Sequence, residues 1–238
     1  MKIYAISDLH LSISTPKPMS IFGAIWDNYT EEIEKDWNEK VNDDDVVLLA
    51  GDFSWAMYLE DAVKDYDYLN RLKGRKVMIR GNHDYWWQSI SAVRNSAPEN
   101  IYFLQNDCVR FENILICGTR GWAVPEQNYV QTEEDLKIYK RELIRLELAL
   151  QSAKKMYKEG DILIAMIHYP PFNSSLDSSD YTQLMEKYGV NICVFGHLHG
   201  NKIRSKLEYS KNGIQYYLTS CDRLGNKLKY ICSSSQKD

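Results

Sequence analysis

The stretch Val46-Val47-Leu48-Leu49-Ala50-Gly51-Asp52-Phe53-Ser54 decides the fold, because a continuous apolar run ends directly at a glycine and a carboxylate. The run has no polar face, so Asp45–Ala50 is predicted to be a strand that is buried on both sides. Similar apolar or β-branched runs recur along the chain, at Lys2–Ser7, Lys76–Arg80, Ile101–Leu104, Cys108–Phe111, Ile114–Gly118, Asp161–Ile167 and Asn191–Phe195. The chain therefore contains a set of strands, several of which end beside Asp, Asn or His.

Helical patterns separate many of these strands, at Ile21–Lys40, Leu59–Leu72, Trp86–Asn95, Glu133–Lys158 and Ser179–Tyr188. Strands that alternate with helices indicate an α/β fold with parallel strands. The segment 101–118 has no such helix, and Lys211-Asn212-Gly213 is a hairpin signal between Ile203–Tyr209 and Ile214–Thr219, so we expect mixed sheets. No linker or repeat interrupts the sequence. We therefore expect one domain over residues 1–238, with the serine-rich end Ser233–Asp238 frayed.

The longest predicted helix, Glu133–Lys158, has clear signals at both ends. Thr132 suits the N-cap and is followed by three acidic residues, and Gly160 is a plausible stop. An apolar stripe runs along it, made of Leu136, Tyr139, Leu143, Leu146, Leu150, Ala153 and Tyr157. We favour packing of this stripe on a sheet. The alternative is a lid or a dimer interface formed by this helix and the loop 118–131, and the oligomeric state is left open.

Composition narrows the class of protein. The 238 residues carry a net charge of −4, so no general polyanion-binding surface is expected, and nucleic acid is considered only as a substrate. The start of the chain lacks the features of a signal peptide, and no apolar run is long enough to span a membrane. The five cysteines have no CxxC spacing and fall mostly in apolar stretches. We therefore expect reduced core thiols in a cytoplasmic protein that does not interact with membranes.

All five histidines fall inside short polar motifs. The motifs are Asp8-Leu9-His10, Gly81-Asn82-His83-Asp84, His168-Tyr169-Pro170-Pro171 and Gly196-His197-Leu198-His199-Gly200, with Gly51-Asp52 between the first two. Each follows an apolar run, and the carboxyl ends of parallel strands gather at one edge of a sheet. Each motif alone is most often a turn or a helix cap, but their occurrence together favours a metal centre.

Seven side chains are candidate ligands: Asp8, His10, Asp52, Asn82, His168, His197 and His199. Seven are too many for one ion, whereas a bridging Asp52 lets two divalent ions take four each and keep positions open for water and substrate. Carboxylate, imidazole and amide ligands without thiolate suit Mn, Fe, Zn, Co or Ni, and we favour manganese. Two divalent ions outweigh two aspartates, so the centre attracts phosphate.

In their order and spacing these blocks resemble the calcineurin-like metallophosphoesterase superfamily. The resemblance implies a four-layer αββα sandwich of two mixed β-sheets flanked by helices. It implies one ion on Asp8, His10, Asp52 and His199, and a second on Asp52, Asn82, His168 and His197. It further implies that a hydroxide bridging the ions attacks phosphorus in line, and that His83 contacts the phosphate and protonates the leaving oxygen.

One position departs from the protein phosphatases of this superfamily, which carry a second acid where this chain has Trp55. We therefore expect a phosphodiesterase or a small-molecule phosphatase. The alternatives are a nuclease, a metal-binding module without hydrolysis, and a non-catalytic protein-interaction scaffold, although scaffolds typically lose ligands that are present here. Asp84 is expected to support the loop rather than to act in catalysis.

Residues around the motifs give weaker signals. Aromatic residues flank them and are expected mainly to pack, although they could cover a base or an acyl or aryl group: Trp55, Tyr85, Trp86, Trp87, Trp122 and Tyr169. Arg80, Arg120 and Arg223 are weak candidates for phosphate contacts. The loop that begins at Gly118 is our candidate for a specificity element.

Overall fold

A computed structural model describes residues 1–126, 131–200 and 205–235, and its first sheet has the strand order β11-β1-β2-β3-β4. Four of its strands are parallel: β1 (Lys2–Ile6), β2 (Val46–Leu49), β3 (Arg75–Ile79) and β4 (Ile101–Leu104). The fifth, β11 (Lys229–Ser233), pairs with β1 in the antiparallel direction. The sequence does not mark β11 as a strand, because it is short and only Ile231 is deeply buried in it.

The second sheet has the order β5-β6-β7-β8-β10-β9. Its centre is parallel and consists of β6 (Ile114–Thr119), β7 (Ile162–Ile167), β8 (Ile192–Phe195) and β10 (Ile214–Leu218). The two edge strands are antiparallel to their neighbours, β5 (Asp107–Phe111) and β9 (Glu208–Lys211). Both sheets are mixed, which confirms the prediction.

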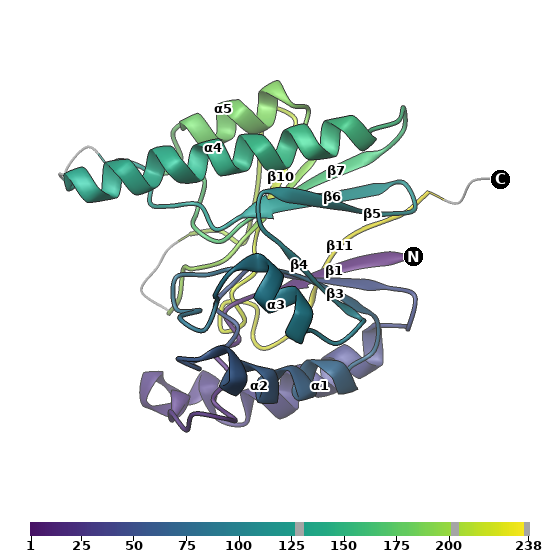
Figure 1. Cartoon of the computed structure of the whole chain (residues 1–238), viewed down its shortest axis with the longest axis vertical. Coiled ribbons are helices and arrows are strands. Elements are labelled where there is room, and N and C mark those ends of the chain that lie inside the picture. Colours follow the sequence, from purple (N-terminus) through teal and green to yellow (C-terminus); the bar gives the residue numbers. More distant parts are fainter. Residues whose placement is uncertain (127–130, 201–204, 236–238) are drawn as a thin grey trace.

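Helices cover the outer faces of the two sheets. Figure 1 shows α1 (Tyr29–Lys40) and α2 (Leu59–Arg71) on the side of the first sheet, and α4 (Glu133–Met156) and α5 (Asp180–Lys187) on the side of the second. The short α3 (Ile90–Ser96) packs beside β4. The four-layer order of helices, sheet, sheet and helices is therefore the predicted one. Within the described part of the chain, no helix has both the length and the apolar character needed to cross a bilayer.

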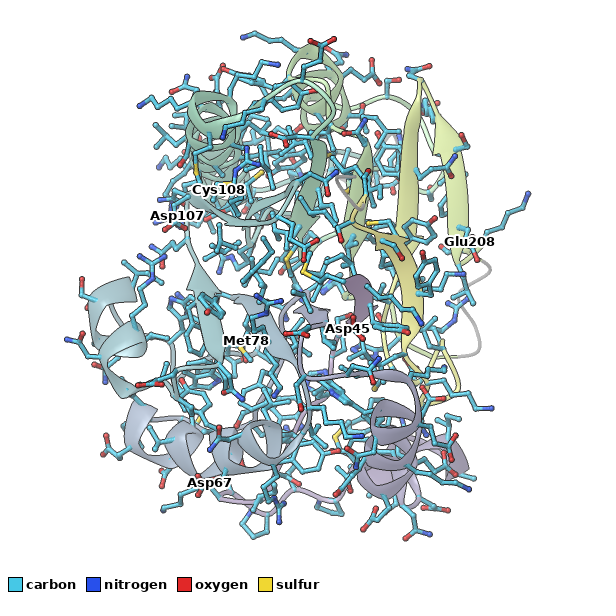
Figure 2. All side chains as sticks on the ribbon, turned by 90° about the vertical axis from the view of Figure 1, so that its right-hand side faces the viewer. Asp45, Asp67, Met78, Asp107, Cys108 and Glu208 are labelled. Atoms are coloured by element: carbon cyan, nitrogen blue, oxygen red, sulfur yellow. The ribbon has the colours of Figure 1, made fainter. Side chains whose placement is uncertain are left out.

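The strands are continuously apolar because each of their faces meets a different core. Ile3 and Ala5 of β1 lie in the layer between the two sheets, whereas Tyr4 and Ile6 lie in the layer shared with α1 and α2. Met78 of β3 belongs to that outer layer, and Figure 2 shows it among side chains between strand and helices. Burial on both faces holds the strand ends firmly, and these ends carry the polar motifs.

Two predicted helices are shorter than expected. The pattern over Ile21–Lys40 contains two short 3₁₀ turns, Met19–Phe22 and Ala24–Trp26, before α1 begins at Tyr29. Gly23 has a φ of 125° and Asn28 a φ of 52°, and neither conformation continues a helix. The pattern over Trp86–Asn95 yields only α3, because both tryptophans turn into the core before Ser89 caps the helix.

The longest helix agrees with prediction at its start and on its buried face. Thr132 and Asp135 form a reciprocal capping box, and Tyr139, Leu146, Leu150 and Ala153 are buried against β5 and β6. Packing of the helix on the sheet is therefore confirmed. Leu136 and Tyr157 of the predicted stripe are exposed instead, and Glu142 occupies a buried position. Part of the loop 118–131, residues 127–130, lies outside the described residues.

The hairpin and the terminus also need correction. The strand expected at Ile203–Tyr209 is β9 at Glu208–Lys211, and residues 201–204 lie outside the described part of the chain. Asn212 and Gly213, both with positive φ, make the turn. Ser233 belongs to β11, and Ser235 donates its N–H to Asn113, so the predicted fraying is wrong for 233–235; residues 236–238 are not described. All five cysteines are free.

Candidate metal centre

The polar motifs follow five parallel strands, three in one sheet and two in the other. Asp8, Asp52 and Asn82 come after β1, β2 and β3, while His168 and His197 come after β7 and β8. Because both sheets present their carboxyl ends on the same side, the two sets meet there. His168 Nδ1 lies 2.8 Å from the carbonyl oxygen of Ala50, and the His197 N–H donates to Asp8 at 3.1 Å. Each sheet therefore holds ligands of the other in place.

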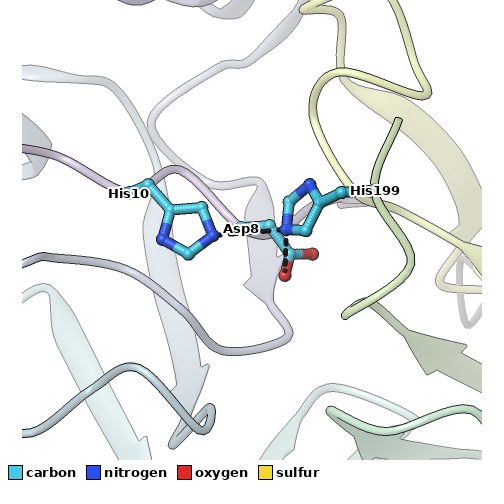
Figure 3. A group of neighbouring side chains, drawn as sticks. All are labelled: Asp8, His10 and His199. Atoms are coloured by element: carbon cyan, nitrogen blue, oxygen red, sulfur yellow. Dashed lines mark hydrogen bonds and ion pairs between the residues drawn. The ribbon is translucent and has the colours of Figure 1, made fainter. Parts of the chain in front are cut away.

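One cluster of candidate ligands joins Asp8, His10 and His199, which point toward one another in Figure 3. His199 Nε2 lies 3.1 Å from Asp8 Oδ1 and 3.2 Å from His10 Nε2. His10 Nε2 also lies 3.8 Å from Asp52 Oδ2. These four side chains can converge on one ion.

A second cluster is built around Asn82 and Asp52. The Asn82 Oδ1 atom lies 2.8 Å from His168 Nε2 and 2.9 Å from His197 Nδ1. His168 Nε2 lies 3.4 Å from the same Asp52 Oδ2 atom that faces His10. All seven predicted ligands are thus brought together in two sets. Asp52 Oδ2 faces a histidine of each set, and the Asp8 carboxylate, a member of the first set, also lies close to Asp52 and His168.

The donor set fits divalent ions. Asp8, Asp52 and His168 are essentially excluded from water, and nitrogen and oxygen atoms that can each bind a metal face one another, with His10 Nε2 3.2 Å from His199 Nε2 and His168 Nε2 2.8 Å from Asn82 Oδ1. A buried, converging set of this kind is costly without a cation at its centre. The ligands are imidazoles, carboxylates and one amide oxygen, with no thiolate, which suits first-row divalent metals.

Within each cluster, one histidine has a raised pKa and the other a lowered pKa. Burial lowers the pKa of His168 and His199, but the carboxylates beside them outweigh it and raise the pKa to about 9 and about 10, respectively. His10 and His197 have weaker partners, and burial lowers the pKa of each to about 4. Without ions, two histidines therefore hold protons that the carboxylates attract, and two are neutral and ready to coordinate.

The backbone is strained where the ligands sit. Asp8, His10, Asp52 and His197 all have positive φ, between 45° and 71°, which non-glycine residues adopt rarely. Two close approaches require glycine: a Cβ on Gly51 would lie 2.7 Å from His168 Nδ1, and one on Gly81 would collide with the Asp52 carboxylate. The strain and the tight fit indicate that these side chains are positioned for a function and not only for packing.

Sequence reasoning missed Asp222, which supports the first cluster from behind. Its Oδ1 atom lies 3.2 Å from His199 Nδ1, and its Oδ2 atom accepts the Gly200 N–H at 2.7 Å. A carboxylate on the remote nitrogen of a ligand histidine fixes the ring and increases its basicity. Asp222 follows β10, so its place after another parallel strand was the available signal.

Asp84 ties two motif loops together, as expected for a supporting residue. Its buried carboxylate accepts backbone N–H groups of Asp52 at 3.0 Å, Phe53 at 2.9 Å and Gly81 at 2.7 Å, together with the Trp86 indole at 3.1 Å. Burial raises the pKa of Asp84 to about 6, while the backbone donors oppose this increase. The group is therefore mostly ionised at neutral pH and acts as an acceptor.

His83 stands over the clusters without joining either. The backbone N–H of His83 donates to Asp52 Oδ1 at 2.7 Å. Its imidazole ring lies between the rings of Trp55 and Tyr85, and the His83 and Trp55 ring centroids are 4.9 Å apart. Its Nδ1 atom lies 3.4 Å from the Tyr85 hydroxyl. Burial lowers the pKa of His83. In place of the second acid of protein phosphatases, Trp55 stacks on His10 with centroids 4.6 Å apart.

The aromatic residues around the motifs divide between packing and pocket. Trp86 and Trp87 are buried in the outer core, as expected, and Tyr169 packs on His197 with ring centroids 4.2 Å apart. A pocket of about 460 Å³ opens directly beside the centre. His10, His83 and His199 form its polar wall, and its apolar wall contains Met19, Phe22, Trp26 and Trp55. A phosphoester held at the centre can place an apolar or aromatic substituent there.

Comparison with known proteins defines the class. The family model for calcineurin-like phosphoesterases matches residues 1–201, and the chain belongs to that family. An uncharacterized protein from Methanocaldococcus jannaschii is 31% identical over 119 residues, which cover 44% of this chain and 64% of that protein.

Solved structures support the same fold. Phosphopantetheinyl hydrolase from Mycobacterium tuberculosis has a TM-score of 0.57 and 13% identity, with coverage of 100% of this chain and 98% of the other. A protein from Thermus thermophilus has a TM-score of 0.56 and 13% identity, with 97% of each chain covered. At these identities the likeness shows a shared fold alone. The family and the candidate ligands together indicate a metal-dependent phosphoesterase.

Proposed function

We propose that the chain hydrolyses a phosphodiester or a small phosphomonoester with two divalent ions, for which we favour manganese. One ion is assigned to Asp8, His10, Asp52 and His199, and the other to Asp52, Asn82, His168 and His197. The observation that supports this is Asp52 Oδ2, which lies 3.8 Å from His10 Nε2 in one cluster and 3.4 Å from His168 Nε2 in the other. One carboxylate between two sets of ligands is the arrangement that a pair of ions requires.

The ions would polarise the phosphoryl oxygens and lower the pKa of the attacking water. The chain's own residues then supply the rest. His83 lines the pocket beside the clusters and is half buried. Burial lowers its pKa, so its role as proton donor to the leaving oxygen requires that the negative charge of a bound phosphate raise that pKa again. Its backbone N–H bond to Asp52 couples the position of this ring to the shared ligand.

The substrate is proposed to be a small molecule rather than a phosphoprotein. Trp55 occupies the position of the second acid found in protein phosphatases, and it lines the apolar wall of the pocket. A pocket of about 460 Å³ accommodates one ring system or a short acyl group, not an extended peptide. A nuclease role is less favoured because the net charge is −4.

The test compares bis-p-nitrophenyl phosphate with p-nitrophenyl phosphate after chelation and reconstitution with Mn²⁺. Faster metal-dependent cleavage of the diester indicates a diesterase, and the reverse indicates a small-molecule phosphatase. Asp52→Asn should lose metal binding and activity together, whereas the exposed Asp43→Asn should keep both. No hydrolysis of either substrate with two ions bound would instead leave a highly selective enzyme or a non-catalytic scaffold.

His83 is tested separately. His83→Ala should bind both ions but turn over about 100-fold or more slowly, since a general acid typically contributes a factor of this size. Metal content measured by atomic absorption distinguishes this outcome from loss of the centre. Full activity in His83→Ala would show that the proposed acid role is wrong.

A further inference from the structure

A second pocket, of about 290 Å³, is rich in arginine, and none of the described residues that line it is a candidate metal ligand. Arg80 follows β3, Arg120 follows β6, and Arg141 and Arg145 project from α4. We refer to these four residues and the space between them as the arginine pocket. Among the described residues that line it, Glu142 is the one acidic residue.

The positive charge of the arginine pocket is only partly balanced. Glu142 is fully buried, and its Oε1 atom lies 2.7 Å from Arg145, 3.5 Å from Arg120 and 3.6 Å from Arg141. Its Oε2 atom accepts the Thr119 hydroxyl at 3.0 Å. One carboxylate is thus shared among three guanidinium groups.

The fourth arginine has no anionic partner. In the described residues Arg80 makes no ion pair, and the Nε atoms of Arg80 and Arg120 are buried without any hydrogen-bond acceptor. A buried donor without an acceptor is costly, so these two nitrogens favour an acceptor that comes from outside the chain. Gln88 and Gln105 complete the wall with further polar groups.

The arginine pocket is connected to the metal centre through short contacts. Arg80 immediately precedes the Gly81-Asn82 motif, and the carbonyl of Arg120 accepts the N–H of His168 at 2.9 Å. The Arg120 guanidinium lies 4.8 Å from the Trp122 ring, and the Trp122 and Tyr169 rings have centroids 5.0 Å apart. Tyr169 in turn packs on His197, so two aromatic rings in series, Trp122 and Tyr169, stand between Arg120 and this candidate ligand.

We propose that the arginine pocket is a second anion site that binds a phosphate group. Guanidinium groups bind phosphate oxygens in bidentate fashion, and four of them around one carboxylate leave a positive excess for an incoming anion. The favoured source is a second phosphate of the substrate whose first phosphate is held by the ions. That assignment of the source rests on the proposed function, whereas the site itself does not.

Direct binding tests the site without any need for activity. Inorganic phosphate is titrated by calorimetry into the full chain carrying Asp52→Asn, in which the metal centre no longer competes for phosphate. Binding is expected, and adding Arg80→Gln or Arg141→Gln should weaken it by about 10-fold or more, since one charge-assisted hydrogen bond is worth that much. Arg80 and Arg141 are the residues replaced because Arg145, which is present in both variants, keeps the buried Glu142 in an ion pair.

The matched control is Arg71→Gln, since Arg71 is an exposed arginine at the end of α2 and should leave binding unchanged. Unfolding curves identify variants that fail to fold. Absence of phosphate binding to the Asp52→Asn protein, or equal binding by the Arg80 and Arg141 variants, overturns the site.

A second arm identifies the source of the phosphate. With Mn²⁺-loaded protein, a nucleoside 3′,5′-bisphosphate should bind about 10-fold or more tightly than the corresponding 5′-monophosphate, and Arg80→Gln should remove that advantage. Equal affinity for the two probes, with inorganic phosphate still bound, overturns the substrate source and assigns the pocket to free phosphate. Absence of hydrolysis would contradict the proposed function and leave these binding results intact.

Discussion

At the scale of single residues, Lys76 is a charge in an apolar environment. It lies on the inner strand β3 and is fully buried, and among the described residues its ammonium group donates to the carbonyl of Leu72 alone. Burial lowers its pKa to about 8 from 10.5. Because the unfolded chain holds this proton more tightly, the lysine costs stability at pH 7, and the cost decreases as the pH rises from about 8 toward 10.5.

We therefore predict that Lys76→Met raises the free energy of unfolding at pH 7 by about 1–3 kcal/mol. Urea unfolding of the variant and the wild type at pH 7 and at pH 9.5 measures this difference in unfolding free energy. The difference between the variant and the wild type should shrink at the higher pH, which separates this lysine from other groups that titrate there. A difference that does not depend on pH would contradict the assignment to the ammonium charge.

Asp84 is also a buried ionisable group whose raised pKa means that ionisation costs free energy on folding, but unlike Lys76 its carboxylate accepts hydrogen bonds from several donors. Its carboxylate accepts from the backbone of Asp52, Phe53 and Gly81 and from an indole. Asp84→Asn places an amide N–H₂ against some of these donors, so we predict a loss of about 2–4 kcal/mol in unfolding free energy. Urea unfolding with Asp43→Asn as the surface control measures it. Equal stability of the two variants would contradict the supporting role.

Residue-level predictability depended on whether a residue belongs to a recognisable motif. All seven candidate ligands lie in such motifs, and the structure brings them together. Asp222 was missed because no histidine or glycine accompanies it in the sequence, although it holds His199 at 3.2 Å. A supporting carboxylate is recognised by the residues that it contacts, and contacts between distant segments cannot be read from a single amino-acid sequence.

At the scale of elements, the start of α4 is stabilised by a local capping box. The Thr132 hydroxyl accepts the Asp135 N–H, and the Asp135 carboxylate accepts the Thr132 N–H, both at 3.1 Å. Because Thr132 is exposed, its replacement removes little packing. We predict that Thr132→Ala lowers the free energy of unfolding by about 1 kcal/mol, measured by urea unfolding, and that Thr132→Ser retains most of it. A destabilised Thr132→Ser would show that the methyl group and not the cap matters.

The elements that could be predicted were those whose pattern has one physical cause. Strands such as β2 and β7 are apolar throughout because both faces are buried, and no other local structure explains so short and continuous a run. The pattern at Ile21–Lys40 fails because two residues of positive φ, Gly23 and Asn28, interrupt an otherwise helical spacing. Tertiary packing at Trp86 and Trp87 overrode the local signal in the same way.

At the scale of the whole molecule, the two sheets share one inner core and one functional edge. The convergence of five motifs could be predicted from the rule that carboxyl ends of parallel strands gather. The arginine pocket could not, because its members come from β3, β6 and α4 and follow no spacing. The way α4 packs on the second sheet determines which of its charged side chains reach the strand ends. That packing depends on how all the layers are arranged, and local sequence does not reveal it.

The last prediction concerns removal of the metals from the assembled molecule. Three hydrophobic cores hold the fold without contribution from the candidate ligands. In the metal-free chain, Asp8 faces His199 at 3.1 Å and Asp52 faces His168 at 3.4 Å, so both buried carboxylates keep a cationic partner. We therefore expect the chelated protein to stay folded but inactive.

Adding Mn²⁺ back should raise the melting temperature, because ions that bind only the native state stabilise it by about 2.7 kcal/mol at 100 times their dissociation constant. Differential scanning calorimetry with and without chelator measures the shift, and circular dichroism checks that the apo chain is folded. Asp52→Asn should show little or no shift, since it lacks the shared ligand. A chelated protein that unfolds would mean that the ions complete the fold itself, and an equal shift in Asp52→Asn would place the ions elsewhere on the chain.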